Sequence, residues 1–504
     1  MTRRHFRTLG LISVLLLTLG AGALPPAANA QDTAIVHFPW VPNNEGISGL
    51  GSWSAVVAFH NVSDTPCALS VFVVQSGGWT RTAQLSLNAA STRTIAASSL
   101  GVPKPGSPMR LEAACQIAAS LKQFSPPTSS SPWSDGANVV TGYTALTSSD
   151  VAASRQGADA GWVLPLVQTN TGWNTLITVA NLGETSAATS LKLYAFDNPN
   201  GEAGAEMTFS RSLAAGEAWT LNVEQVLSRV GWIGFARLTS SGDIGVIARR
   251  IKPSANMAMT NVGIATSSLA QGSYRTAAPL LFNAYNGWNT GITLANPSTQ
   301  PATVTVEYME ADGGYIGDTQ IVVPPSAMQY IYTPSDVSQA GFVGSANITS
   351  NVPIISSVDE VKYETSDGLS YTTTGARNTK LVIPLLFRES PQKSKSDNSG
   401  ISISNLDSIS STTVQVELLS IYGVDLLDAP IEVFIPAGSV GVVYLPFVEA
   451  IAPGTIVTAR LSASNSTGIV AISNDINYAV AGDGSTVFSA TGAAGVYIAG
   501  GAGQ

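Results

Sequence analysis

The chain has 504 residues, of which 44% are hydrophobic and only 11% are charged, and its formal net charge is −9. An acidic chain repels phosphate backbones, which argues against nucleic acid as a partner, and low charge with many apolar residues argues against intrinsic disorder. The length exceeds what one hydrophobic core supports, so several domains are expected.

The first 30 residues have the features of an export signal. Three arginines within the first seven residues form a basic start, an apolar run covers residues 9–24, and a small-x-small cleavage site ends at Ala30. The apolar run is too short for a membrane span, and the arginine pair fits either the general or the twin-arginine export pathway. We expect a secreted, extracellular chain that begins at Gln31. Without the three leader arginines it carries 21 basic against 33 acidic residues, a net charge of −12.

The rest of the chain contains four copies of one sequence repeat. Each copy contains a strand that ends in asparagine, at Asn61, Asn181, Asn296 and Asn405. These anchors are 120, 115 and 109 residues apart, the size of one sandwich domain. The expected organisation is a signal peptide at 1–30 and repeats at 31–155, 156–272, 273–378 and 379–504. The first repeat is the most diverged, and the last ends in a glycine-rich tail.

Within each copy the hydrophobic period is two. Residues 303–308 and 413–418 alternate β-branched and apolar with polar side chains, as strands with one buried and one wet face do. Turn signals such as Asp312-Gly313-Gly314 separate the strands. Seven or eight strands per copy predict an all-β fold of four tandem antiparallel β-sandwich (immunoglobulin-like) domains. Short helical turns are expected near 224–227 and 335–339.

A resemblance rests on recurring turn and strand motifs. They are Pro324-Pro325-Ser326, Pro436-Ala437-Gly438-Ser439 and the Gly-x-x-x-Ser-Ala run at 341–346. The combination resembles the tandem β-sandwich repeats of large proteins secreted to the bacterial cell surface. It covers all four copies and is weakest in the first. The resemblance implies a fold and an extracellular location, but no substrate and no catalytic residue.

Catalytic chemistry has few candidates after the leader. His37 and His60 are the only histidines there, so a Ser-His-Asp triad would have to use one of them. His60 precedes the anchor Asn61, where other copies hold alanine or serine, which indicates a strand residue that is packed or half exposed. The sequence contains no His-Glu-x-x-His motif, zinc-spaced cysteine pair or phosphate-binding glycine loop. We expect no catalysis, no cofactor and no metal.

Two acidic stretches leave alternatives open. Residues 197–202 offer oxygen ligands at alternate positions, as calcium loops do, but lack the full pattern, and a plain hairpin turn is favoured. Asp359 and Glu360 are the closest carboxylate pair for glycoside hydrolysis. Nothing in the sequence places that pair in a cleft, and a solvated strand edge is the plainer interpretation.

The tryptophans are the binding candidates. Trp53, Trp173 and Trp288 occupy one equivalent position in the loop expected before the second strand, while the fourth copy has a polar stretch there. Tryptophan stacks on sugar rings, so these side chains are carbohydrate-contact candidates; the favoured alternative is that each caps the end of a sandwich core. Trp133 lies in a Ser/Pro-rich loop at 124–138 and is expected to be exposed.

Cys67 and Cys115 are the only cysteines, and both lie in predicted turns of the first copy. In a sandwich these two turns can lie at the same end. An exported chain meets an oxidising compartment, so we predict a disulfide between them. Metal binding is disfavoured because two lone cysteines lack further ligands.

These features together predict an extracellular structural or adhesive protein built as an elongated array. Its partners would be other cell-surface proteins or glycans, and the alternative function is carbohydrate binding through loop aromatics. Residues 492–504 are rich in glycine and alanine and contain no sorting motif or hydrophobic anchor. Either surface retention would then be non-covalent or the protein would be released, and the tail would either be disordered or donate a strand to a neighbouring molecule.

Overall fold

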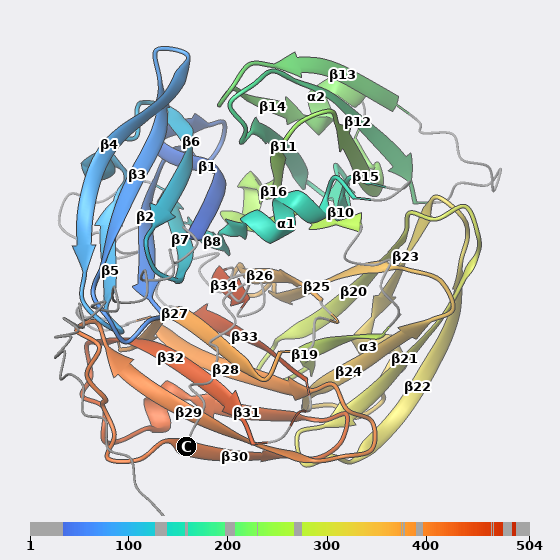
Figure 1. Cartoon of the computed structure of the whole chain (residues 1–504). Helices are drawn as coiled ribbons and strands as arrows, with labels where there is room; N and C mark the ends of the chain where they lie inside the picture. Colours follow the sequence, from blue (N-terminus) through green and yellow to red (C-terminus); the bar gives the residue numbers. More distant parts are fainter. Residues whose placement is uncertain are drawn as a thin grey trace, which may run out of the picture. The chain divides into compact units, whose positions relative to one another are not determined.

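The computed structural model describes residues 34–125, 139–156, 160–196, 207–228, 230–266, 275–373, 375, 378–389, 397–464, 466, 468–476 and the backbone of 486–489 (Figure 1). Its strands form four β-sandwiches, which we number along the chain. The predictions for Trp133, the leader, the acidic turn at 197–202 and the tail at 492–504 lie outside the described residues.

Each sandwich contains eight main strands. Sandwich 1 has β1 (Ala34–Ile47), β2 (Gly51–Asn61), β3 (Cys67–Gln75), β4 (Gly78–Leu87), β5 (Thr92–Ala96), β6 (Gly106–Ala113), β7 (Ile117–Ser125), β8 (Val139–Thr144) and the short β9 (Leu146–Thr147). Sandwich 2 has β10 (Trp162–Gln168), β11 (Asn174–Asn181), β12 (Ala187–Ala195), β13 (Met207–Leu213), β14 (Ala218–Asn222), β15 (Ile233–Ser240), β16 (Ile244–Lys252), β17 (Met257–Val262) and the short β18 (Ile264–Ala265). Sandwich 3 has β19 (Arg275–Asn283), β20 (Asn289–Asn296), β21 (Ala302–Glu310), β22 (Tyr315–Val323), β23 (Ala327–Tyr332), β24 (Phe342–Ser350), β25 (Ile355–Lys362) and β26 (Asp367–Thr372). Sandwich 4 has β27 (Lys380–Arg388), β28 (Asn398–Asn405), β29 (Thr412–Ser420), β30 (Ile431–Ile435), β31 (Val440–Tyr444), β32 (Thr455–Ala463), β33 (Ile469–Ile476) and β34 (Thr486–Ser489).

Helical segments are few and short among the described residues. They are α1 (Ser148–Ala153), α2 (Val223–Leu227), α3 (Thr333–Asp336) and the 3-10 turns η1 (Ala97–Leu100), η2 (Pro253–Ala255) and η4 (Leu445–Phe447). The two helical turns expected from the sequence correspond to α2 and α3, whose ends differ from the expected ones by at most three residues. Both follow the fifth strand of their sandwich.

The strand order is the same in all four sandwiches. The fourth, third, sixth and first strands pair in that order, and so do the fifth, second, seventh and eighth. These are two separate sheets in sandwiches 2 and 3, whereas in sandwiches 1 and 4 the first strand also pairs with the second and joins them. All of these pairings are antiparallel, for example β10 with β15 and β11 with β16. The all-β class and the antiparallel sandwich arrangement are therefore confirmed. The order itself differs from the ABED and CFG sheets of immunoglobulin domains.

A β-bulge recurs in the first strand of every sandwich. The register against the sixth strand shifts across the repeated proline, which is Pro39, Pro165, Pro279 or Pro384. Proline has no N–H to donate to a ladder, so it is tolerated in a strand at such a bulge. In sandwich 1 the bulged strand β1 continues into the second sheet, where it pairs with β2.

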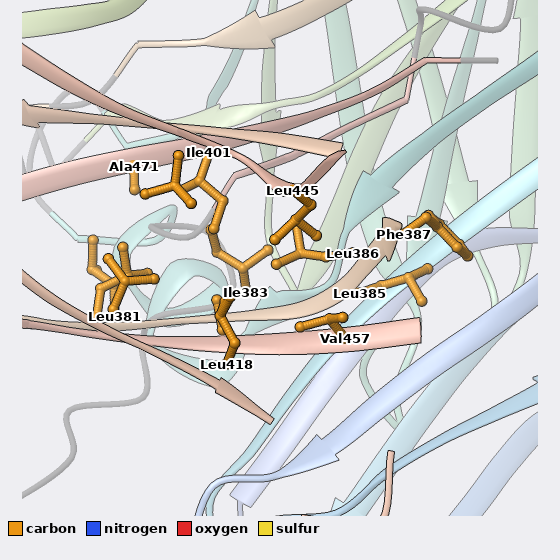
Figure 2. Close-up of a cluster of buried hydrophobic side chains, with 14 of the residues drawn as sticks. Leu381, Ile383, Leu385, Leu386, Phe387, Ile401, Leu418, Leu445, Val457 and Ala471 are labelled. Carbon is orange, nitrogen blue, oxygen red and sulfur yellow. The ribbon is translucent and has the colours of Figure 1, made fainter. Parts of the chain in front are cut away.

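Alternating side chains form the core of each sandwich. On β29 the buried residues Val414, Val416 and Leu418 alternate with the more exposed Gln415 and Glu417. Figure 2 shows Leu418 gathered with residues of other strands, such as Ile383 and Ile401, in the buried cluster of sandwich 4. Burying one such aliphatic side chain contributes about 1.5–3 kcal/mol.

The sandwiches contact one another directly. Strand β8 packs against β17 and β34, and β26 packs against the same two strands, so the eighth strands of all four sandwiches meet. The described residues from Ala34 onward belong to one compact unit. The expectation of an elongated array is wrong for this structure, because sandwich 4 contacts sandwich 1. The domain boundaries proposed from the repeat spacing stay predictions.

The physical reason is that the outer sheet faces are also apolar. Val163 and Phe235 of sandwich 2 form one buried cluster with Ala295, Met328 and Ile355 of sandwich 3. Sheets that are apolar on both faces must be covered on both faces. The neighbouring sandwich supplies that cover.

Candidate functional site

The four repeated asparagines are structural. Each side chain is fully buried, and its amide donates to backbone carbonyls of two different turns. Its carbonyl oxygen accepts a backbone N–H two residues further on, in Ser63, Gly183, Ser298 and Asp407 respectively. The side chain thus ties the turn after the second strand to the turn before the fifth. This requirement explains why asparagine recurs once per sandwich.

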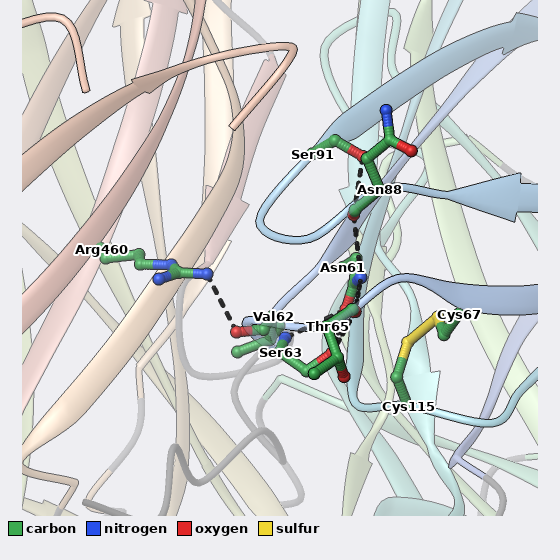
Figure 3. The surroundings of a disulfide bond; sticks show 9 residues. All are labelled: Asn61, Val62, Ser63, Thr65, Cys67, Asn88, Ser91, Cys115 and Arg460. Carbon is green, nitrogen blue, oxygen red and sulfur yellow. Dashed lines mark hydrogen bonds between the residues drawn. A yellow bond between two sulfur atoms is a disulfide. The ribbon is translucent and has the colours of Figure 1, made fainter. Parts of the chain in front are cut away.

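The predicted disulfide between Cys67 and Cys115 is present, with Cα atoms 5.8 Å apart (Figure 3). Strand β3 pairs with β6, and Leu69 lies opposite Ala113. Continuing that register by two residues brings Cys67 opposite Cys115. The bond therefore extends an existing ladder at the end of the sandwich where the Asn61 network also lies (Figure 3).

The tryptophan candidates are not exposed. Trp53, Trp173 and Trp288 are 1%, 5% and 3% exposed, so none presents a ring face for a sugar, and the carbohydrate-contact prediction is wrong for these three. Trp53 packs against Ile251 and other residues of sandwich 2, and Trp173 packs with Val361 of sandwich 3. The capping interpretation is closer, but two of the three rings fill junctions between consecutive sandwiches.

The histidines are buried and have lost basicity. Burial, followed by the charge of Arg110, lowers the pKa of His37 to about 4. Burial, followed by the charge of Arg460, lowers the pKa of His60 to about 3. The His60 Nδ1 atom lies 3.0 Å from the Thr92 hydroxyl, an arrangement that a nucleophile and its base also use. The side chains of His60 and Thr92 are almost completely buried at the contact between sandwiches 1 and 4, so no substrate can reach this pair.

A repeated position on the sixth strand binds the following sandwich. Arg110 of sandwich 1 donates to Glu184 of sandwich 2. Asn347 of sandwich 3 donates to a backbone carbonyl of sandwich 4. Arg460 of sandwich 4 donates to the carbonyl of Val62 in sandwich 1, at 2.9 Å (Figure 3). The side chain at this position in sandwich 4 therefore binds sandwich 1, just as the side chains at this position in sandwiches 1 and 3 bind the sandwich that follows them in the chain.

The seventh strands carry buried charges at two adjacent aligned positions. The first position is defined by its partner on the second strand, which is the residue five places before the asparagine anchor. It is occupied by Lys122, Arg249, Asp359 and Asn474. The next position holds Gln123, Arg250, Glu360 and Asp475. Neighbouring residues on a strand point to opposite faces, so each copy sends one of these side chains to each side of its sheet.

Lys122 joins sandwich 1 to sandwich 4 through two carboxylates. Its ammonium lies 2.7 Å from Asp397 and 2.6 Å from Asp475, and all three side chains are at most 2% exposed. Burial, opposed by Lys122 and reinforced by the Asp397 carboxylate, raises the pKa of Asp475 to about 7. One cation thus neutralises a site that would otherwise hold two buried negative charges.

Two arginines form the corresponding contacts of sandwich 2. Arg249 binds Glu45 of sandwich 1 through both terminal nitrogens. Arg250 binds Asp359 of sandwich 3 in the same bidentate way, and the Ser370 hydroxyl donates to that carboxylate at 2.7 Å. Such paired hydrogen bonds fix orientation as well as charge.

The acidic pair of sandwich 3 does not form a hydrolytic site. Asp359 is held by Arg250, whereas Glu360 is fully buried and neither of its oxygens has a hydrogen-bond partner within the described structure. Burial, and then the charge of Asp359, raises the pKa of Glu360 well above its usual range. The expectation of a solvated strand edge is wrong, because the contact with sandwich 2 covers Asp359 and the sandwich itself encloses Glu360.

The exposed aromatic side chains are mostly tyrosines that the sequence reasoning did not single out. Tyr330 and Tyr332 on β23 are 40% and 41% exposed, and Tyr363, directly after β25, is 59% exposed. Burial of its hydroxyl end, then the charges of Asp359, Tyr363 and Tyr332, raise the pKa of Tyr330. The strand register brings the three phenols to one side of the sheet, because Tyr332 and Asp359 both lie opposite Gly291 and Tyr363 follows Asp359 by four residues. Two tyrosines one residue apart on a strand, hence on one face, were the available sequence signal.

Metal and membrane sites have no further candidates in the described ranges. No group of three His, Cys, Asp or Glu side chains within them could hold a metal ion. No helix among the described residues is long and apolar enough to cross a membrane.

No protein-family model matches the sequence, and no curated protein matches it. Two solved structures are similar to part of the chain. The structure titled Thermotoga maritima 1070 is 13% identical, with a TM-score of 0.19, over 21% of this chain and 95% of that one. The Anabaena sensory rhodopsin transducer is 17% identical, with a TM-score of 0.15, over 17% of this chain and 92% of that one. Both TM-scores are too low to support an inference about this chain.

Proposed function

We propose that this chain is a secreted, non-catalytic protein that acts outside the cell as a structural or adhesive component. The observation that supports this most is the use of the repeated polar positions. Arg110, Arg460, Lys122 and Arg250 each bind the adjoining sandwich. These repeated positions could have formed the same reactive site in all four copies. They contribute instead to contacts that join the sandwiches to one another.

The chemistry of the two histidines agrees with a non-catalytic role. Both are buried with strongly lowered pKa values, whereas a general base needs a pKa near the working pH and access to substrate. Secretion is supported by the leader pattern of the first 30 residues and by the disulfide, which persists in oxidising compartments. Partners would then be cell-surface proteins or glycans.

Two measurements test the proposal. Fractionation of cells that express the full chain, or a variant without residues 1–30, should find only the full chain outside the cell. Purified, labelled protein should bind to cell envelopes and should release no product from cell-wall polymers. A chain that stays in the cytoplasm, or that turns over a polymer, would overturn the proposal.

A further inference from the structure

A tyrosine surface lies where sandwich 3 adjoins sandwich 2. We define it as Tyr330, Tyr332 and Tyr363 together with Lys252 at its edge. Tyr332 lies opposite Gly291 on the neighbouring strand β20, and Tyr330 lies opposite Thr293. Tyr330 and Tyr332 point to the same side because they are two residues apart on a strand. Each of the three rings keeps about half of its surface exposed.

Glycine at position 291 makes room for this surface. A β-carbon on Gly291 would lie 1.8 Å from the Tyr330 hydroxyl oxygen, so the Tyr330 ring lies across the neighbouring strand and a side chain at position 291 would displace it. The hydroxyl end is covered while the ring remains partly exposed. Sandwich 4 has the same pair, Gly400 opposite Tyr444, whereas sandwiches 1 and 2 have Val56 and Leu176 at the aligned position and no tyrosine on the fifth strand. Glycine weakens a strand interior, and its presence marks close approach of another group.

Lys252 supplies a cation without a carboxylate partner. Its ammonium lies 5.0 Å from the ring centre of Tyr363 and 5.8 Å from that of Trp173. No ion pair joins Lys252 to a carboxylate in the described part of the chain. Asp359, the acidic group that influences Tyr330 and Tyr363, is already held by Arg250. The positive charge at this edge is therefore available to an anionic ligand.

We propose that the tyrosine surface binds an acidic polysaccharide. The apolar faces of its sugar rings pack on the exposed phenol rings, and a uronate carboxylate pairs with the Lys252 ammonium. Tyrosine combines an apolar face with a polar tip, which suits a ligand with both characters. The chain is acidic overall, but charges farther than about 8 Å are largely screened at physiological ionic strength, so the local cation decides. The inference rests on the proposed adhesive function and names its ligand class.

Polygalacturonate and its fully methyl-esterified form test both parts of the proposal. They share a backbone and differ in whether the carboxylates are charged. Isothermal titration of the purified full chain should show binding to polygalacturonate and much weaker binding to the ester. Lys252→Gln should weaken binding of polygalacturonate about tenfold or more, because a charge-assisted contact is lost. Tyr363→Ala should weaken it a few-fold through lost ring contact.

The matched control is Tyr422→Ala, which removes a tyrosine that is 74% exposed on sandwich 4 and should leave binding unchanged. Thermal unfolding checks that each variant is folded, and Tyr332→Ala replaces Tyr363→Ala if the latter is not. Equal binding by the wild type and the surface variants would overturn the site. Equal binding of the ester would overturn the pairing with Lys252. Failure to bind either polymer would overturn the ligand class, whereas the proposed function falls only if the labelled chain also fails to adhere to cell envelopes.

Discussion

Replacing Asn296 with alanine should destabilise sandwich 3 more than any exposed asparagine substitution. The Asn296 amide donates to the carbonyls of Gln300 at 2.7 Å, Val323 at 3.0 Å and Pro324 at 3.1 Å. Its carbonyl oxygen accepts from the backbone N–H of Ser298 at 3.0 Å and from the Ser298 hydroxyl at 2.7 Å. Alanine removes all five hydrogen bonds at once.

The size of the loss in unfolding free energy depends on which hydrogen-bonding groups are left without a partner where water cannot reach them. The bond to Val323 is fully buried, whereas the bonds to Gln300 and Pro324 are partly buried and water can replace them in part. A buried group left without a partner costs about 1–3 kcal/mol, and a replaceable bond about 0.5–1.5 kcal/mol. We therefore expect a loss of about 2–4 kcal/mol. Asn296→Asp should cost at least as much, because it removes the donors and adds a buried charge.

Urea unfolding of the wild type and Asn296→Ala measures this loss of unfolding free energy as a shift of the urea midpoint, provided that the dependence of the free energy on urea concentration is the same for both proteins. Hydrogen exchange of the β20 amides assigns the shift to sandwich 3, since joined sandwiches need not unfold in a single step. The control is Asn351→Ala, which removes one exposed hydrogen bond to Thr303 and should cost less than about 1 kcal/mol. Equal losses in Asn296→Ala and Asn351→Ala would refute the structural role of the repeated asparagine.

Four further outcomes are expected. Cys67→Ser should lower the stability of sandwich 1 by at most about 4 kcal/mol in the chain-entropy treatment; wild-type protein whose melting temperature is unchanged by reductant would contradict this. Lys122→Met should cost about 3–5 kcal/mol because it leaves Asp397 and Asp475 buried without their cation, and Asp475→Asn added to it should restore part of the loss; a single variant as stable as the wild type in urea would count against the buried pair. The raised pKa of Asp475 adds stability that is complete below its ordinary value of 3.8 and is lost as pH rises through about 7; the stability difference between wild type and Asp475→Asn should fall over that window, and a flat difference would disprove the assignment. His60, with its pKa lowered to about 3, should show no NMR titration between about pH 5 and 8, and a midpoint near its ordinary value of 6.5 would mean that the ring is exposed.

Local pattern was sufficient for several residues of the candidate sites. The disulfide of Cys67 and Cys115 could be predicted because both cysteines were expected near one end of a single sandwich and no other thiol competes, although Cys67 is the first residue of β3 and does not lie in a turn. The place of His60 beside an asparagine anchor predicted a packed or half-exposed strand residue, and the contact with sandwich 4 completes its burial. The disulfide depends on contacts within a single sandwich, whose strand order is shared by the four copies.

Contacts between sandwiches could not be predicted in the same way. Trp53 and Trp173 occupy equivalent positions, yet whether a ring at that position meets solvent depends on the sandwich beside it. The same holds for Asp359, which reads as a surface carboxylate until Arg250 of another sandwich is placed against it. The exposure of Tyr330, Tyr332 and Tyr363 likewise depends on the neighbouring sandwich, because sandwich 2 adjoins this face and leaves the three side chains 40%, 41% and 59% exposed.

The amino-acid sequence by itself determined the strands, their turns, the fourfold repetition and the disulfide. A period of two, glycine-rich turns and a repeated asparagine act over a few residues, so they are legible in the chain order. Only the tertiary structure decided which outer faces are covered, which charges are buried and that sandwich 4 returns to sandwich 1. Burial of an apolar outer face yields about the same free energy whichever complementary face covers it. The choice of partner therefore depends on the shape and the charges of the two sheets as wholes.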